Sequence, residues 1–288
     1  YWQVGAPILW LPFFLIGHGV AWLYSLLGYP VTADGYSFPY HAFTFLASAC
    51  EVFVALILCY KILKRFYTQS TSLVATLLMF TATCLPYFTF IRNRMSHSGD
   101  LLVAFVFFLF FLDFRDKQEK PPQFFVWWGI CAGILFDLRY SNLVYLILPC
   151  GLFLKTYLAD KEFFNREKKF RILLGGVAFI ITTLPQWITW LKLNGAMKPE
   201  TSGMAIALHP GFTGLLNAFK DLFFSRAWGV LFVEPIWLLG LAGLIMVLKR
   251  DRWLGTLCWL TFLGCAVVPI VLGNGASFGQ RYLIPAFP

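Results

Sequence analysis

The feature that most constrains this chain is a series of apolar blocks, each of roughly 14–23 residues, separated by short polar turns. A helix rises about 1.5 Å per residue, so about 20 apolar residues cross the hydrocarbon core of a bilayer. Hydrophobic residues make up 59% of the 288 residues and charged residues only 13%. The sequence therefore predicts an all-α polytopic membrane protein, and it excludes a disordered chain, a disulfide scaffold and a collagen-like fibre.

We expect about eight transmembrane helices. They are predicted at 41–63, 73–91, 99–114, 124–137, 142–158, 172–193, 229–248 and 253–272. Residues 7–28 are also long and apolar enough to span a membrane. The prolines, glycines and aromatic residues of this segment equally favour a helix that lies in the outer membrane interface, so the residues themselves leave both alternatives open.

The basic residues predict how the chain is oriented in the membrane. The turns after the first, third, fifth and seventh predicted spans, together with Lys155, hold 15 of the 23 Lys and Arg residues. These turns are predicted to be cytoplasmic, because cytoplasmic loops of membrane proteins carry an excess of basic residues. The net charge of +9 is therefore explained by membrane orientation, and we expect no nucleic-acid partner.

The seven cysteines all lie inside apolar blocks, their number is odd, and no CxxC pair occurs. We expect buried small side chains here, and neither disulfides nor a zinc site. The chain begins at Tyr1, already inside an apolar segment, and it ends at Pro288, in what reads as the approach to another span. We expect it to be an internal fragment of a longer protein.

The basic residues outside the cytoplasmic turns are the first candidates for function. Five of them are arginines near predicted membrane boundaries, namely Arg92, Arg94, Arg139, Arg226 and Arg281. Arginine binds phosphate through two parallel hydrogen bonds, so these residues are candidate phosphate ligands. The alternative is that each of them extends toward lipid headgroups.

Two further candidates are acidic or histidine residues near the outer boundary. His97 and Asp100 are three residues apart, so they share a face if a helix has begun there. Such a pair can bind a metal or a phosphate, although a metal site needs three or four ligands and capping also accounts for Asp100. Glu51 lies well inside the first predicted span, where a carboxylate is either functional or a protonated structural group.

Two polar turns complete the candidate set. Asp137 and Arg139 are close enough in sequence to pair with each other. The last segment, 273–288, holds three glycines together with Gln280, Arg281 and Tyr282. A glycine-rich backbone next to a cation can bind an anion, and a plain outer turn is an equally good interpretation.

Several stretches of this sequence, in matching order, resemble the bacterial GT-C superfamily of integral-membrane glycosyltransferases. They are YWQVGAPILWLPFFLIGH, DGYSFPYH, RMSHSGDLLVAF, GICAGILFDLRYSN, LFFSRAWGVLFVEP and GASFGQRYLIPAFP. The superfamily includes dolichyl-phosphate-mannose–protein mannosyltransferases and the aminoarabinose–lipid A transferase. The resemblance implies a single transmembrane domain over 1–288, with an outer juxtamembrane segment at 1–40, a helical bundle at 41–272 and an outer loop at 273–288.

The resemblance also implies an activity, which is the transfer of a sugar from a polyprenyl-phosphate donor to a glycan, lipid or protein acceptor. Transfer is expected to invert the anomeric carbon, on the periplasmic side of a bacterial inner membrane. The expected catalytic carboxylate precedes Tyr1, and some family members use a divalent metal. The expected substrate-binding residues are Arg94, His97, Asp100, Arg139, Arg226, Gln280, Arg281 and Tyr282. A transporter or flippase of lipid-linked sugars, and an O-antigen ligase or polymerase, are the alternatives.

Overall fold

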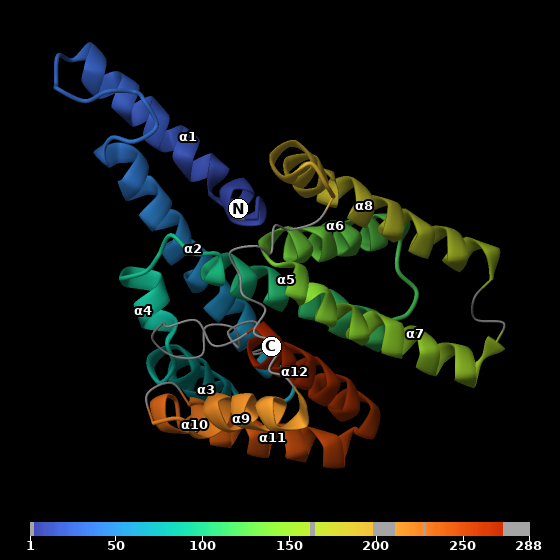
Figure 1. Cartoon of the computed structure of the whole chain (residues 1–288). Coiled ribbons are helices and arrows are strands. Elements are labelled where there is room, and N and C mark those ends of the chain that lie inside the picture. Colours follow the sequence, from blue (N-terminus) through green and yellow to red (C-terminus); the bar gives the residue numbers. More distant parts are fainter. Residues whose placement is uncertain (1–2, 162–164, 198–210, 227–228, 273–288) are drawn as a thin grey trace.

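The structure is a computed structural model, and it describes residues 3–161, 165–197, 211–226 and 229–272. The described chain is helical (Figure 1). In chain order the helices are α1 (Gly5–Leu26), α2 (Phe38–Leu63), α3 (Gln69–Thr81), α4 (Leu85–Phe90), α5 (His97–Asp116), α6 (Pro122–Leu138), η1 (Tyr140–Leu146), α7 (Ile147–Ala159), α8 (Arg166–Asn194), α9 (Gly211–Phe224), α10 (Val230–Val233), α11 (Trp237–Arg250) and α12 (Arg252–Leu272).

Within the described residues, five helical segments are long and apolar enough to cross a membrane. They are Gly5–Leu26, Phe38–Leu63, His97–Asp116, Tyr140–Ala159 and Arg166–Asn194, and Pro122–Leu138 and Arg252–Val267 are shorter apolar helices. The predicted membrane-type helical protein is therefore supported, whereas the number of eight spans stays a prediction.

Two of the expected spans are not continuous helices, which corrects the sequence prediction. The expected span 73–91 is divided into α3 and α4, and 229–248 is divided into α10 and α11. Pro86 lies in the first turn of α4, and Pro235 lies between α10 and α11. Proline has no N–H to donate and its ring collides with the carbonyl four residues earlier, so a helix ends before it.

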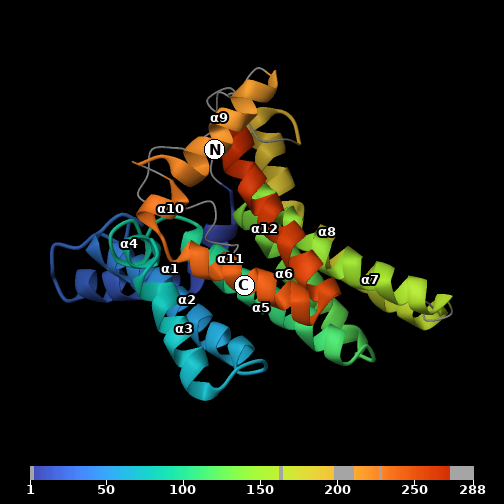
Figure 2. The ribbon, with the colours of Figure 1, turned by 90° about the horizontal axis from the view of Figure 1, so that it is seen from below.

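Helix α5 lies at the centre of the described chain, as Figures 1 and 2 show. Thirteen of its twenty residues are buried. In Figure 2, α1, α3 and α4 lie on one side of the molecule and α7 and α8 on the other, with α5, α6, α11 and α12 between them. The phenylalanines of α5 fill this centre, with Phe105, Phe107, Phe111 and Phe114 at most 2% exposed.

The basic turns gather at one end of the bundle, which we call the basic end. Arg65 at the end of α2 pairs with Asp113 of α5 at 2.6 Å, and Arg115 of α5 pairs with Asp251, between α11 and α12, at 3.7 Å. Glu119, after α5, pairs with Lys168 of α8 at 2.7 Å. The turns after α2, α5, α7 and α11 thus lie together, as expected if all four of them face the same side of a membrane.

Helices α1 and α2 form an antiparallel hairpin that extends beyond the other helices (Figure 1). Gly17 of α1 lies against the backbone of α2, where an added Cβ would come within 3.1 Å of the Pro39 carbonyl oxygen. The His18 Nδ1 and the Tyr40 hydroxyl are 2.6 Å apart, and the Phe14 ring packs on Tyr40. Residues 7–26 of the segment whose position was left open above therefore belong to one helix, α1, which packs on α2.

Among the described helices, α6 and α8 share the most extensive contact, and glycines let their backbones approach. An added Cβ at Gly129 of α6 would lie 2.1 Å from the Gly175 carbonyl oxygen of α8. One turn later, an added Cβ at Gly133 would lie 2.6 Å from the Thr182 side chain. Small residues at such crossings let two membrane helices approach closely enough for van der Waals contact along their whole length.

We expect Gly129→Ala to destabilise the protein, because the added methyl group collides with a backbone carbonyl that cannot rotate away. Overpacking of this kind costs about 1–3 kcal/mol. Gly176→Ala is the matched control, since a Cβ at Gly176 of the same helix pair meets nothing within 4 Å. Thermal unfolding of the two purified variants measures the difference, and equal midpoints would contradict the close packing of α6 on α8.

Candidate functional site

The candidate site lies at the end of the bundle opposite the basic end, and we call it the polar end. Here α5 begins, α6 ends and η1 follows. The Nε of Arg139 donates to Asp100 Oδ2 at 2.9 Å and to the Ser96 hydroxyl at 3.3 Å. The Asn142 side-chain amide donates to the other oxygen, Asp100 Oδ1, at 2.9 Å. Asp100 is completely buried, so its charge is balanced by Arg139 and by hydrogen bonds, not by water.

His97 belongs to the same cluster and is 1% exposed. The Arg139 Nη2 lies 2.6 Å from His97 Nδ1 and 3.3 Å from Nε2. The guanidinium has only protons to donate, so the closer ring nitrogen accepts and the ring proton is carried by Nε2. The ring of Phe88 packs on the imidazole, with centroids 4.4 Å apart, and fixes its plane.

A second buried carboxylate lies on the other side of the start of α5. Glu51 of α2 is 6% exposed, and its Oε2 accepts from the Ser98 hydroxyl at 2.5 Å. Between the two carboxylates, Gly99 is in contact with Leu9 and Leu138, so a Cβ there would lie 2.8 Å from Leu9 Cδ1. The first turn of α5 thus joins α1, α2 and α6 at one point.

Asp137 does not pair with Arg139, and this prediction was wrong. Asp137 is completely buried, and within the described residues neither of its side-chain oxygens has a hydrogen-bond partner. Residue 137 is still helical, whereas Arg139 has left the helix with φ −158° and ψ 127°. This change of backbone direction turns the two side chains apart, so Arg139 meets Asp100 instead.

Only part of the expected substrate-binding set comes together. Arg139, His97 and Asp100 form one cluster, whereas Arg94 and Arg226 are exposed. Gln280, Arg281 and Tyr282 lie outside the described residues. Among the described residues, Arg139 is therefore the one arginine of the expected set that lies in this cluster.

Several residues of the polar end were not among the expected ligands. Ser96 and Asn142 complete the Arg139 cluster. Glu234, which is 2% exposed, accepts from the Cys84 backbone N–H at 2.7 Å and from the Trp237 indole at 2.8 Å. It thereby ties the break between α3 and α4 to the break between α10 and α11. The only sequence signal for Glu234 is a carboxylate directly before a proline inside an apolar block.

Metal binding at His97 and Asp100 is not favoured by the geometry, because both side chains are turned toward a guanidinium that already carries the positive charge. Over residues 3–161, 165–197, 211–226 and 229–272, no group of three or more His, Cys, Asp or Glu side chains is placed to hold a metal ion.

Asp34 has a local structural role. It lies in the exposed turn between α1 and α2, where it accepts from the Thr32 hydroxyl and from the Tyr36 and Ser37 backbone N–H groups. The Thr32 hydrogen bond, helped by the backbone donors, lowers the pKa of Asp34 below its usual value. An ionised Asp34 therefore favours this turn, and the contribution is lost as the pH falls through the lowered pKa.

Comparison with known protein families, curated proteins and solved structures finds no match for this chain. The resemblance to GT-C glycosyltransferases therefore stays a prediction from the sequence stretches quoted above.

We expect Arg139→Gln to destabilise the protein strongly, because it leaves the buried Asp100 carboxylate without its cation. Removing one partner of a buried ion pair costs about 3–5 kcal/mol. The double variant Asp100→Asn with Arg139→Gln removes both charges, and we expect it to be more stable than the single variant. Thermal unfolding of the three proteins checks the order, and a double variant less stable than Arg139→Gln would contradict the pairing.

Proposed function

We propose that this protein is a membrane glycosyltransferase that moves a sugar from a polyprenyl-phosphate donor to an acceptor on the extracytoplasmic side of a bacterial inner membrane. The observation that carries the proposal is the cluster at the polar end. There Arg139 is held by Asp100, Ser96 and His97, at the end of the bundle opposite the basic turns. A lipid-borne phosphate reaches a membrane protein at such a boundary between apolar helices and polar loops.

The arrangement suits a reaction in which negative charge develops on a phosphate. The acceptor oxygen attacks the anomeric carbon, the bond from that carbon to the phosphate oxygen breaks, and the electron pair leaves with the polyprenyl phosphate. The proton of the acceptor passes to a general base. A cation oriented before the reaction stabilises the leaving phosphate without having to reorganise, which is a large contribution to catalysis in a site shielded from water.

The local contacts explain how Arg139 is held in place. Its side chain is 16% exposed, and its Nε is fixed on Asp100. Asn142 fixes the second oxygen of that carboxylate, and Phe88 packs on His97. A rigid and partly exposed guanidinium is better suited to bidentate phosphate binding than a mobile one, because less side-chain entropy is lost on binding.

The test is sugar transfer in membrane vesicles that contain the full-length protein. We expect Arg139→Lys to lower turnover of a polyprenyl-phosphate sugar by about 100-fold, because lysine keeps the charge and loses the planar fork. Arg166→Lys is the matched control, since Arg166 is an exposed arginine at the start of α8, at the basic end. Each variant is first shown to be monodisperse in detergent, and turnover is then compared at equal amounts of protein in the vesicles.

Two outcomes would overturn the proposal. The first is wild-type turnover by Arg139→Lys, which would show that the Arg139 guanidinium does not bind the donor phosphate. The second is movement of the lipid-linked sugar across the vesicle membrane without transfer of its label to an acceptor, which would identify a transporter.

A further inference from the structure

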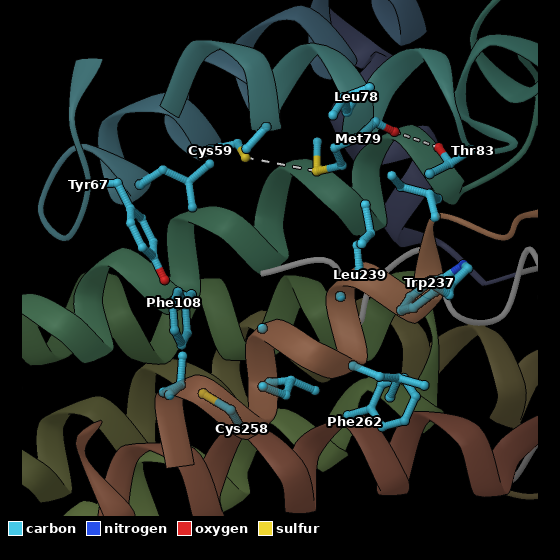
Figure 3. Close-up of a pocket in the computed structure, with 18 of the residues that line it drawn as sticks. Cys59, Tyr67, Leu78, Met79, Thr83, Phe108, Trp237, Leu239, Cys258 and Phe262 are labelled. Carbon is cyan, nitrogen blue, oxygen red and sulfur yellow. Dashed lines mark hydrogen bonds between the residues drawn. The ribbon is translucent and has the colours of Figure 1, made fainter. Parts of the chain in front are cut away.

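A cavity of about 480 Å³ lies between two helix pairs, away from the Arg139 cluster (Figure 3). One wall is formed by α2 and α3, with Cys59, Leu78 and Met79, and the facing wall by α11 and α12, with Leu239 and Phe262. Phe108 of α5 forms part of its floor. Helix α3 packs on α2 and α4, and α11 packs on α10 and α12, which leaves the space between them open.

Three of the hydroxyl groups that line the cavity are already satisfied by backbone carbonyls. The hydroxyls of Ser72, Thr83 and Thr261 each donate to the backbone carbonyl four residues earlier in their own helix or at its end, at 2.7–2.9 Å. They therefore present their carbon atoms to the cavity. An occupant of this space gains from burying hydrocarbon and finds few polar partners.

The cavity is open to the side, between α3 and α11. Apolar residues on its rims are exposed, with Leu78 of α3 at 41% and Leu239 of α11 at 65%. In a membrane-spanning bundle this mouth faces the hydrocarbon of the bilayer, so a lipid chain can enter without crossing water.

The size of the cavity fits one fatty acyl chain. A volume of about 480 Å³ lies within the range of small-molecule pockets, and an acyl chain of roughly 16 carbons is a ligand of that kind. The cavity runs along α3, from Tyr67 before the helix to Thr83 after it. Thirteen helical residues extend about 20 Å, which is close to the length of an extended chain of that size. A long polyprenyl chain would leave most of its carbons outside.

The end of the cavity at Tyr67 adjoins the basic end. Lys64 lies three residues before Tyr67, and Lys249 and Arg250 follow the cavity residue Val247 within one turn. All three cations are exposed, and within the described residues no ion pair engages them. Asp113 and Asp251, the carboxylates nearby, are paired with Arg65 and Arg115 instead. This end is therefore suited to an anionic headgroup.

We infer that this cavity binds an anionic phospholipid, with one acyl chain between α3 and α11 and the headgroup phosphate at Lys64, Lys249 and Arg250. The occupant comes from the leaflet on the side of the basic turns, opposite to the leaflet from which a donor lipid would reach Arg139. The inference does not depend on transferase activity, and it concerns a different end of the molecule.

The first experiment fills the cavity from within. A Cβ at Gly243, which lines the cavity, meets nothing within 4 Å, so the first atom that Gly243→Leu adds lies in open space. The matched control is Gly176→Leu on α8, where a Cβ is equally free and the residue lies outside the cavity. We expect native mass spectrometry of the full-length protein to show at least tenfold weaker binding of a palmitoyl-oleoyl phosphatidylglycerol to Gly243→Leu, and unchanged binding to Gly176→Leu.

A second experiment separates the headgroup from the chain. We expect the double variant Lys64→Gln with Arg250→Gln to bind phosphatidylglycerol and phosphatidylcholine equally, whereas the wild type prefers phosphatidylglycerol. Lys169→Gln, an exposed lysine at the same end on α8, is the control and keeps the preference. If Gly243→Leu does not fold, Gly240→Leu at the rim serves the same purpose, since a Cβ there also meets nothing within 4 Å.

Three results would overturn the inference. They are equal binding of phosphatidylglycerol by the wild type and by the folded cavity variant, no preference of the wild type for an anionic headgroup, and displacement of phosphatidylglycerol from the wild type by an equimolar polyprenyl phosphate. The last result would assign the cavity to the donor lipid of the proposed transferase.

Discussion

The polar end depends on the ion pair between Asp100 and Arg139. An isolated charge in an apolar interior costs several kcal/mol, and two charges are tolerated there only when they meet in good geometry and their remaining atoms are hydrogen-bonded. Asp100 meets this condition through Arg139, Asn142 and Ser96. The pair therefore fixes where α6 ends, because Arg139 reaches Asp100 only after the backbone has left the helix. The ion pair between Asp100 and Arg139 thus holds the start of α5 against the end of α6.

The two ends of the bundle use charge in different ways. At the basic end the pairs are partly exposed, as in Arg65 with Asp113, where the side chains are 33% and 42% exposed. Exposed pairs contribute little to stability, so the loss of one such pair at the basic end costs little. At the polar end Arg139 and Asp100 are 16% and 0% exposed. Loss of one partner there is costly, and the same burial makes Arg139 a rigid group that can take part in binding.

Much of the helical architecture could be predicted from the sequence, because apolar blocks bounded by charged turns leave a membrane chain few choices. The expected spans 41–63, 99–114 and 172–193 lie within α2, α5 and α8. The helix breaks near Pro86 and Pro235 were missed because one proline hardly changes the mean hydropathy of an apolar block. The sequence indicated Asp100 as a ligand or a helix cap. Its pairing with Arg139 depends on the extended backbone at residue 139, which composition and residue spacing do not predict.

The helix breaks and the lateral cavity have a common physical origin. A continuous helix over 73–91 or 229–248 would need its backbone groups to bond within the helix, whereas each break frees groups that must be satisfied elsewhere in an apolar setting. Glu234 bonds both the Cys84 N–H and the Trp237 indole, so it holds the two breaks together. Trp237 and Thr83 then form one end of the cavity. One carboxylate thus satisfies groups at both breaks and holds α3 and α11 together at this end of the cavity.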